Sequence, residues 1–146
     1  MIKVIICGIN GKMGQVTSAS VKKAEGMELV GGIDIVPDAI KNDVPVFDNI
    51  ADCNVDADVI IDFSRPVALE GNLRYAANNN CAIIIATTGY SAEQKAMIKE
   101  ASKSIPVFFS ANMSLGVNMQ FELVRQISEF IFQHGGYINE IATVFD

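Results

Sequence analysis

The sequence predicts a doubly wound α/β fold, with a mostly parallel sheet between two layers of helices in a three-layer α-β-α arrangement. Two observations lead to this prediction. Short β-branched apolar runs alternate along the chain with segments that have helical spacing or helix-start residues. The first apolar run also ends directly in the glycine-spaced stretch GINGKMG, where a helix is expected to begin. Strands that alternate with helices in this way form parallel sheets covered on both faces.

The first β-α-β unit is the clearest part of the pattern. Residues 2–7 form a continuous apolar run, residues 12–24 are expected to be helical, and Gly26 can end that helix. A second strand, MELVGGID, is expected to end near Asp34. The whole unit takes about 33 residues, which is the length that a parallel crossover needs. The helix prediction rests on the spacing of Met13, Val16, Ser20 and Val21.

The alternation of strands and helices continues along the chain. VPVF is expected to be a short extended piece, proline opens one later helix and Ser91 is expected to cap another. The last helix carries an apolar stripe and is expected to stop before two glycines. The remaining expected strands are 57–63, 81–87 and 105–110, and the remaining expected helices are 66–79, 91–104 and 117–132.

Length, composition and charge narrow the class of protein. The chain has 146 residues, of which 50% are hydrophobic and 19% are charged, so we expect one globular domain with a sizeable core. No apolar run approaches the roughly 20 residues needed to cross a bilayer, and no secretory signal is visible at the start. The net charge of −6 argues against a nucleic-acid partner. We therefore expect a cytoplasmic protein with neither a membrane nor a nucleic acid as partner.

The cysteine pattern predicts buried thiols in a reducing compartment. Cys7, Cys53 and Cys81 form no CxxC pair, and two of them stand inside apolar runs. A cysteine in such a run behaves as a small apolar side chain. We expect three reduced core thiols and no metal site.

The stretch GINGKMG has the context of a phosphate-binding loop, with a strand before it and a helix after it. Glycine lets a pyrophosphate approach the backbone, and the helix N-terminus offers free N–H groups and a partial positive charge. An acidic residue about 20 residues further on, at the end of the second strand, would accept the ribose hydroxyls, and Asp34 stands there. The alternative is a tight strand–helix turn that binds no ligand.

Asp34 also indicates which dinucleotide fits. A carboxylate accepts a hydrogen bond from a ribose 2′-hydroxyl and repels a 2′-phosphate. No Arg or Lys follows Asp34 closely, since the nearest is Lys41, whereas Lys12 could either reach a phosphate or stay solvated. The sequence therefore predicts NADH in preference to NADPH, and tenfold tighter binding of NADPH would contradict this.

Three further strand ends carry small, polar or aromatic residues, namely DFSRP (62–66), ATTGY (86–90) and SANMSLGVN (110–118). In a doubly wound sheet these ends lie at the same edge as the glycine loop, where ligands bind. They could present amides and hydroxyls to a nicotinamide-ribose. The alternative is ordinary loops with helix N-caps, such as Asn112 or Ser114.

Together GINGKMG, VIIDFSRP, ATTGY and FFSANMSLGVN, in this order and at this spacing, resemble the 4-hydroxy-tetrahydrodipicolinate (dihydrodipicolinate) reductase family of lysine biosynthesis. The resemblance covers about residues 1–125, and SANMS-GVN is its most specific part. It implies a Rossmann-like dinucleotide-binding domain. It also implies an enzyme that reduces a cyclic dicarboxylate imine or enamine with NADH or NADPH on the route to diaminopimelate and lysine.

The resemblance implies a role for each matching residue in binding the cofactor. The glycine loop would wrap the pyrophosphate, Asp34 would hold the adenosine ribose, Phe63 would flank the cofactor and the later strand ends would meet the nicotinamide. The implied cofactor-binding residues are Gly8, Ile9, Asn10, Gly11, Lys12, Met13, Asp34, Phe63, Ala86, Thr87, Thr88, Ser110, Ala111, Asn112 and Met113.

The sequence departs from the family in two places. Ala86 stands where the family usually has glycine. The chain also ends at YINEIATVFD, before the histidine pair, the lysine and the DAPSGT-like loop that supply the family's proton donor and carboxylate contacts. We therefore expect a dinucleotide-binding domain over 1–134, and over 135–146 the start of a substrate domain otherwise absent from this chain. His134 matches no catalytic position, so no catalytic residue is expected here.

The expectation that follows is a chain that binds a dinucleotide and reduces little by itself. It would be part of a reductase whose dicarboxylate substrate binds only with the missing domain. One alternative is a free-standing dinucleotide-binding module or sensor, and another is a structural domain without a ligand. An apolar face on the last helix would suit a homo-oligomer.

Overall fold

A computed structural model of the chain describes residues 1–110 and the helix 115–134. By their internal contacts, residues Met1–Ala111 and Asn112–Asp146 are two separate compact units, and each is described by itself.

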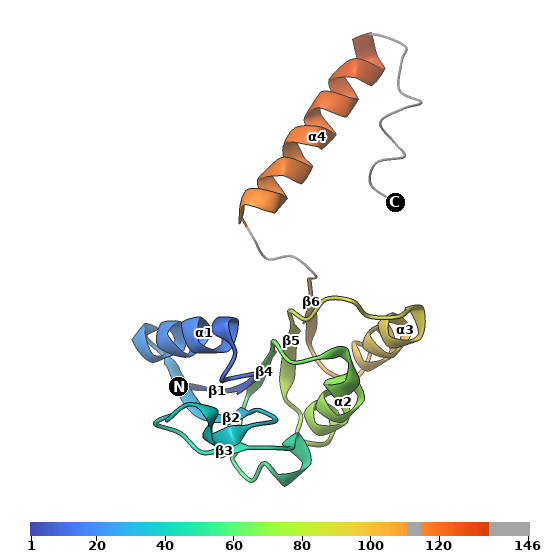
Figure 1. The fold of residues 1–146 in the computed structure, drawn as a ribbon. Helices are drawn as coiled ribbons and strands as arrows, with labels where there is room; N and C mark the ends of the chain where they lie inside the picture. The colour runs from blue at the N-terminus through green and yellow to red at the C-terminus, as the bar shows by residue number, and fades with distance from the viewer. Residues whose placement is uncertain (111–114, 135–146) are drawn as a thin grey trace. The chain divides into compact units, whose positions relative to one another are not determined.

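The first unit is built on one six-stranded sheet in which every neighbouring pair of strands is parallel (Figure 1). The strand order is β3-β2-β1-β4-β5-β6, so the chain changes direction across the sheet between β1 and β4. At that point Cys7, the last residue of β1, is aligned with Ile33 on one side and Asp62 on the other. The strands are β1 (Ile2–Cys7), β2 (Met27–Ile33), β3 (Val46–Phe47), β4 (Val59–Asp62), β5 (Ala82–Ile85) and β6 (Val107–Phe109).

Helices cover both faces of this sheet. Helix α1 (Lys12–Lys23) lies on one face, and α2 (Leu69–Asn78) and α3 (Ala92–Ala101) lie on the other (Figure 1). This strand order with helices on both faces is that of a Rossmann-like fold, so the predicted doubly wound α/β class is confirmed. Short 3₁₀ turns occupy Pro37–Ala39, Ile50–Asp52 and Pro66–Ala68.

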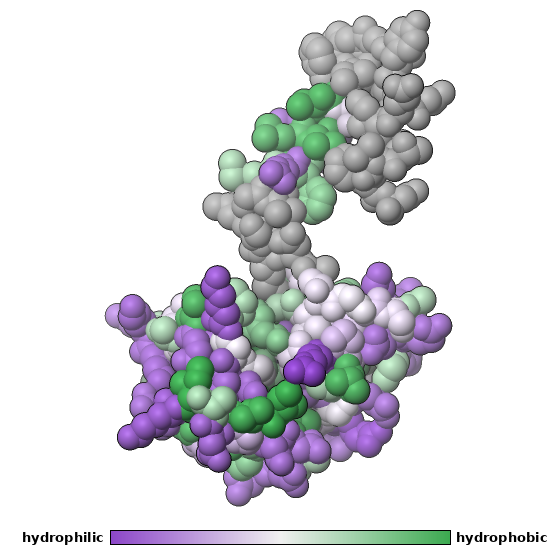
Figure 2. Space-filling view, in the orientation of Figure 1, coloured by the Kyte–Doolittle hydropathy of each residue, from purple (hydrophilic) through white to green (hydrophobic). Residues whose placement is uncertain are grey.

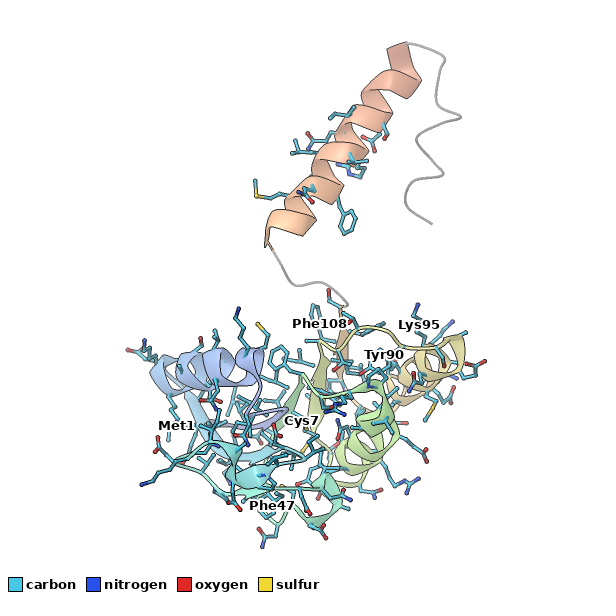
Figure 3. The ribbon with its side chains drawn as sticks, in the orientation of Figure 1. Met1, Cys7, Phe47, Tyr90, Lys95 and Phe108 are labelled. Atoms are coloured by element: carbon cyan, nitrogen blue, oxygen red, sulfur yellow. The ribbon has the colours of Figure 1, made fainter. Side chains whose placement is uncertain are left out.

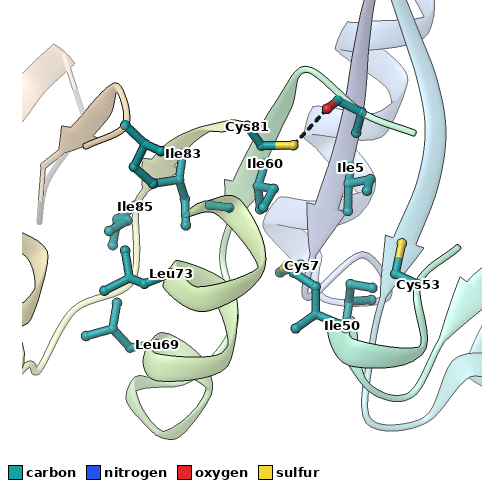
Figure 4. Packing of buried hydrophobic residues seen from close by; sticks show 14 of the residues in the cluster. Ile5, Cys7, Ile50, Cys53, Ile60, Leu69, Leu73, Cys81, Ile83 and Ile85 are labelled. Carbon is teal, nitrogen blue, oxygen red and sulfur yellow. Dashed lines mark hydrogen bonds between the residues drawn. The ribbon is translucent and has the colours of Figure 1, made fainter. Parts of the chain in front are cut away.

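Two apolar clusters hold the layers together, because successive residues of a strand point to opposite faces. From β1, Val4 and Ile6 belong to the cluster beneath α1, whereas Ile5 and Cys7 belong to the larger cluster beneath α2 and α3. Figure 4 shows strand residues of the larger cluster facing α2. Its labelled members are Ile5, Cys7, Ile50, Cys53, Ile60, Leu69, Leu73, Cys81, Ile83 and Ile85.

Helix α1 forms where the spacing predicts it, but the face that it buries is different. Met13 and Val16 are 52% and 55% exposed, and the buried residues are Gly14, Ser18 and Val21. Small residues line the inner face because the first turn of α1 packs directly on the backbone of the preceding loop.

Other element boundaries differ from the expectation by a few residues. The expected strand 57–63 is observed as Val59–Asp62, and the expected helix 66–79 begins with the 3₁₀ turn Pro66–Ala68. Helix α3 begins as predicted after Ser91, whose hydroxyl accepts a hydrogen bond from the amide of Gln94 in a capping box.

All three cysteines are buried, as their sequence context predicts. Cys7 lies in the middle of the sheet layer (Figure 3), where burial, and after it the Asp62 carboxylate, raises the pKa of its thiol well above the usual value. The Cys81 thiol donates to the Ala57 carbonyl oxygen at 2.7 Å. The three cysteines therefore pack as apolar core residues, and burial raises the pKa of the Cys7 and Cys81 thiols.

The surface of residues 1–110 is mostly hydrophilic on the face shown in Figure 2, with apolar residues in separate patches. Its ion pairs, such as Lys3–Asp56 and Lys22–Asp43, join solvent-exposed side chains. Pairs of this kind contribute little to stability. Stability therefore comes mainly from the two apolar clusters.

The second unit contains helix α4 (Leu115–His134), which extends the predicted 117–132 by two residues at each end. Arg125 pairs with Glu122 and Glu129 at helical spacing. The described residues include no helix with both the length and the apolarity to cross a membrane. Among the α4 residues whose side chains the structure describes, 119–129, the apolar side chains more than half exposed are Met119, Phe121, Leu123 and Ile127.

Ile105→Ala should lower the free energy of unfolding by about 3 kcal/mol, because it opens a cavity in the larger apolar cluster. Ile105 is 5% exposed and belongs to the larger cluster. Ile35→Ala, at a side chain that is 67% exposed, is the matched control and should change stability by less than about 0.5 kcal/mol. Urea unfolding followed by circular dichroism measures both. Equal effects of the two substitutions would contradict this account of the core.

Tyr90 should make the stability of the protein depend on alkaline pH. It is buried in the loop between β5 and α3 (Figure 3), with its ring edge-on to Phe109 at 5.8 Å between centroids. Among the described residues its hydroxyl has no hydrogen-bond partner. Burial, and after it the Asp62 carboxylate, raises the pKa of Tyr90 to about 12.

Because the pKa of Tyr90 is higher in the folded than in the unfolded protein, the neutral hydroxyl contributes to stability. This contribution is complete below the unfolded-state pKa of about 10, and it is lost as the pH rises through about 12. Tyr90→Phe cannot ionise, so its stability should fall less steeply than that of the wild type above pH 10. At pH 8 the two should agree to within about 1 kcal/mol, because the hydroxyl has no partner to lose. Urea unfolding at pH 8, 10 and 11 tests this, and parallel alkaline declines would contradict it.

Candidate functional site

A cleft of about 490 Å³ lies at the carboxyl ends of β1, β4 and β5. Three loops that are far apart in the sequence form its walls. They are the glycine loop between β1 and α1, the segment after β4 and the segment after β5. The lining residues are Gly8, Gly11, Lys12, Met13, Gly14, Phe63, Ser64, Arg65, Pro66, Ala86, Thr87 and Thr88.

The glycine loop has a shape that only glycine allows at two positions. Gly8 has a φ of +76°, and a Cβ atom there would lie 2.9 Å from the Phe63 carbonyl oxygen. A Cβ atom at Gly14 would collide with the Gly8 carbonyl oxygen and lie 2.7 Å from the Cα of Ile9. The loop is therefore packed backbone to backbone, both on the end of β4 and on the first turn of α1.

The N-terminus of α1 opens beside this cleft without a side-chain cap. Gly11 is the N-cap residue, and its carbonyl accepts the first helical hydrogen bond, from the amide of Gln15 at 3.0 Å. The amides of Lys12, Met13 and Gly14 precede that bond, and the helix itself offers them no acceptor. Three N–H groups and the positive end of the helix dipole are thus available to an anion.

Two cations line the same cleft. Lys12 and Arg65 are both exposed, and within the described residues neither forms an ion pair. They stand on different walls, Lys12 at the start of α1 and Arg65 after β4. The cleft is therefore suited to a ligand that carries negative charge.

Asp34 follows β2 and touches the glycine loop from its other side. One of its carboxylate oxygens accepts from the Asn10 amide at 3.0 Å, and the other accepts from the Val36 amide at 3.2 Å. The side chain is half-buried and does not line the cleft itself. The predicted proximity of Asp34 to the loop is thus observed, and in this structure the carboxylate holds backbone amides.

Asn10 joins the glycine loop to the segment after β2. Its side-chain amide donates to the Val36 carbonyl at 2.7 Å, and its side-chain oxygen accepts from Asn42 at 2.8 Å. Gln15 donates to the Ile9 carbonyl at 2.9 Å and to the Asn42 side-chain oxygen at 3.3 Å. Sequence reasoning did not find Asn42 or Gln15, because nothing in the sequence shows that residue 42 folds back onto residue 10.

The strand ends at β4 and β5 contribute the remaining wall. Thr87 is buried, and its hydroxyl donates to the Ser64 carbonyl oxygen at 3.1 Å, so this hydroxyl points into the protein. Thr88 is exposed and leaves its side chain available to a ligand. Ala86 lines the cleft, and its amide donates to the Asp62 carbonyl at 3.0 Å.

Most of the predicted site residues meet at this cleft. Gly8, Gly11, Lys12, Met13, Phe63, Ala86, Thr87 and Thr88 line it. Ile9, Asn10 and Asp34 flank it, and the Ser110 amide donates to the Ile85 carbonyl at 3.2 Å. Ala111, Asn112 and Met113 lie outside the described residues. The lining residues absent from the prediction are Gly14, Ser64, Arg65 and Pro66, although each stands in GINGKMG or DFSRP.

The fit of a dinucleotide can be judged from this geometry. Side chains at Gly8 and Gly14 would fill the loop, and the uncapped amides of α1 have no carboxylate facing them from the cleft lining. The site thus has the shape and donors that a pyrophosphate requires. No group of three His, Cys, Asp or Glu side chains suited to a metal ion occurs in the part of the chain that the structure describes.

Residues 2–113 match the family model described as dihydrodipicolinate reductase, N-terminus. The 4-hydroxy-tetrahydrodipicolinate reductase of Clostridium novyi is 46% identical over 134 residues, which are 92% of this chain and 53% of that enzyme. The chain thus spans about half the length of the curated relatives it matches.

Two solved structures share the fold of this chain. The dipicolinate-bound dihydrodipicolinate reductase of Paenisporosarcina sp. TG-14 superposes with a TM-score of 0.71 at 25% identity, over 92% of this chain and 54% of that one. Myo-inositol 2-dehydrogenase of Lactobacillus plantarum, at 18% identity and a TM-score of 0.65, shares the fold over 86% of this chain and 41% of its own. With the family model matched over residues 2–113, the chain belongs to the dihydrodipicolinate reductase family and corresponds to its N-terminal part.

Proposed function

We propose that this chain is the NAD(P)H-binding part of a 4-hydroxy-tetrahydrodipicolinate reductase, an oxidoreductase of the diaminopimelate and lysine pathway. The observation that carries the proposal is the uncapped N-terminus of α1 behind a loop whose shape requires glycine at positions 8 and 14. Family membership and the reductase names of the relatives support it. Residues 1–134 would form the dinucleotide-binding domain, and residues 135–146 would begin the substrate domain.

The proposal assigns a role to each part of the cleft. The amides of Lys12, Met13 and Gly14 would bind the pyrophosphate, with the cations on both walls balancing its charge. Asp34 would accept the adenosine ribose hydroxyls, and Thr88 would meet the nicotinamide side. When bound, the reduced dinucleotide supplies a hydride, and the protein's part is to hold and orient it.

Asp34 also supports a preference for NADH. Its carboxylate would repel a 2′-phosphate, and the nearest following cation is Lys41. Since its oxygens already accept from the Asn10 and Val36 amides, it is held in place before the cofactor arrives. A preplaced acceptor loses little conformational entropy on binding.

Reduction of the dicarboxylate substrate would need groups beyond this stretch of sequence. A hydride transfer to an imine also requires a proton donor and a cationic grip on two carboxylates. We propose that the 146-residue chain binds the dinucleotide in the cytoplasm and shows little reductase activity by itself. Supplying the C-terminal half of a relative should restore activity, and its failure to do so would favour a free-standing dinucleotide-binding module.

The proposal predicts saturable binding of NADH by the purified chain, with NADPH binding more weakly. Asp34→Ala should weaken NADH binding about 10- to 100-fold, because hydrogen bonds to a charged group are lost, and should narrow the difference between the two cofactors. Isothermal titration calorimetry measures both affinities.

Asp38→Ala is the matched control, since it removes the same charge from an exposed position nearby that makes no hydrogen bond to the glycine loop. It should leave NADH affinity within about twofold of the wild type. A folded wild-type chain that binds neither cofactor would refute the proposal, and tenfold tighter binding of NADPH would refute the NADH preference alone.

A further inference from the structure

One buried acid, Asp62, stands directly before the cleft-lining residues Phe63 to Pro66 without lining the cleft itself. Asp62 is the last residue of β4 and its side chain is fully buried, with a relative exposure of 0%. No lysine, arginine or histidine of the described residues forms an ion pair with it. Burying a carboxylate without a cation is costly, and it is tolerated where hydrogen-bond donors surround the oxygens.

Three donors surround the Asp62 carboxylate. Its Oδ1 atom accepts from the Ser64 amide at 2.8 Å and from the Ser64 hydroxyl at 2.5 Å. Its Oδ2 atom accepts from the side-chain amide of Asn72 at 3.1 Å. Asn72 is 2% exposed and lies on α2, so the acid joins the end of β4 to the helix that covers it.

These contacts converge on one residue of the cleft wall. Asp62 holds the N–H and O–H groups of Ser64, and the Thr87 hydroxyl holds its carbonyl oxygen at 3.1 Å. Ser64 is therefore fixed on both sides of its Cα atom. Its neighbours Phe63 and Arg65 line the cleft with it.

The same peptide is the surface on which the glycine loop rests. A Cβ atom on Gly8 would lie 2.9 Å from the Phe63 carbonyl oxygen and 3.3 Å from the Ser64 nitrogen. The Phe63–Ser64 peptide and Gly8 thus define each other's positions. A shift of the Phe63–Ser64 peptide would change the backbone contact that positions the glycine loop.

Charge does not explain why an acid stands at this position. A negative group beneath an anion-binding cleft disfavours the anion, so its benefit cannot be attraction of the ligand. A buried charged group is also weak evidence for stability, because an apolar side chain of similar size serves a core equally well. We therefore attribute the acid at position 62 to its acceptor oxygens, which hold the Ser64 N–H and O–H groups and the Asn72 amide.

We propose that Asp62 is a positioning residue which, with Asn72 and Thr87, fixes the Phe63–Arg65 segment against the glycine loop and so sets the affinity of the cleft for the dinucleotide. This inference rests on the proposed function. Asp62 does not line the cleft, and it would act on the cleft through Ser64, from whose amide it accepts a hydrogen bond.

The first test is Asp62→Asn, which keeps the size of the side chain and replaces one acceptor oxygen with an NH₂ group. That group must face either the Ser64 donors or the Asn72 amide, so a donor opposes a donor. We expect the calorimetric Kd for NADH to rise at least fivefold with unchanged stoichiometry. Loss of folded protein would lower the binding stoichiometry instead of raising the Kd. The Kd and the stoichiometry together therefore distinguish a positioning role from a loss of stability.

Exchanging the aspartate at 62 and the asparagine at 72 should restore the affinity for NADH. Asp62→Asn combined with Asn72→Asp lets the new amide accept from Ser64 and donate to the new carboxylate on α2. The double variant should bind NADH within twofold of the wild type. Ile105→Val and Ile105→Ala, which weaken the core at the amino end of β6, are the stability controls and should leave the Kd unchanged.

Amide hydrogen exchange adds a readout that needs no cofactor. In Asp62→Asn the Ser64 amide loses its acceptor, and its exchange measured by NMR should accelerate at least tenfold relative to the mean of the β1 amides. If Asp62→Asn does not fold, Thr87→Val removes only the hydroxyl that holds the Ser64 carbonyl. It should raise the Kd for NADH two- to fivefold.

The outcomes are distinct. A wild type that binds NADH, with Asp62→Asn binding equally well, overturns the inference and leaves the proposed function intact. Failure of the double variant to recover affinity also overturns it, because the donor pattern would then not be the cause. A wild type that binds neither cofactor refutes the proposed function, and the inference falls with it even if Ser64 exchange accelerates.

Discussion

The contact between Gly8 and the Phe63–Ser64 peptide is the constraint on which the rest of the cleft depends. β1 and β4 are neighbours at the point where the strand order reverses, and Cys7 is aligned with Asp62 there. The loop after β1 can lie against the end of β4 only because Gly8 has no side chain and adopts a positive φ. This contact brings the first amides of α1 beside the segment after β4, and a single added methyl group would separate them.

The glycine loop is also held from the side of β2. Asp34 accepts from the Asn10 amide, and Asn42 donates to the Asn10 side chain. The loop is therefore fixed between the ends of β2 and β4, the two strands that flank β1, with hydrogen bonds on the β2 side and backbone packing on the β4 side. A loop that is already ordered loses less entropy when it receives a ligand, so rigidity here contributes to affinity without any further contact.

The fold was predictable because its signals are local, whereas much of the site depends on tertiary contacts. Each strand and each helix can be predicted from its own residues, without knowledge of the others. The ends of β1 and β2 lie at the same edge of a parallel sheet, and this places Asp34 beside the glycine loop. The inward direction of the Thr87 hydroxyl depends on where β4 lies, and the contact of Asn42 depends on the return of a loop. The exposure of Met13 follows from the close packing of Gly14, which the spacing of apolar residues cannot express.

Acidic and basic side chains have different roles at this edge of the sheet: the acids bind backbone amides, and the cations line the cleft. Asp34 follows β2 and Asp62 ends β4, the two strands that flank β1, and each carboxylate accepts from a backbone amide of the segment that follows its strand. Both acids thus shape the loops from within. The cations Lys12 and Arg65 form no ion pair among the described residues and remain exposed on the cleft walls. Because the acids are engaged by the backbone, they leave the cations unneutralised, and an acidic chain keeps positive charge at the cleft.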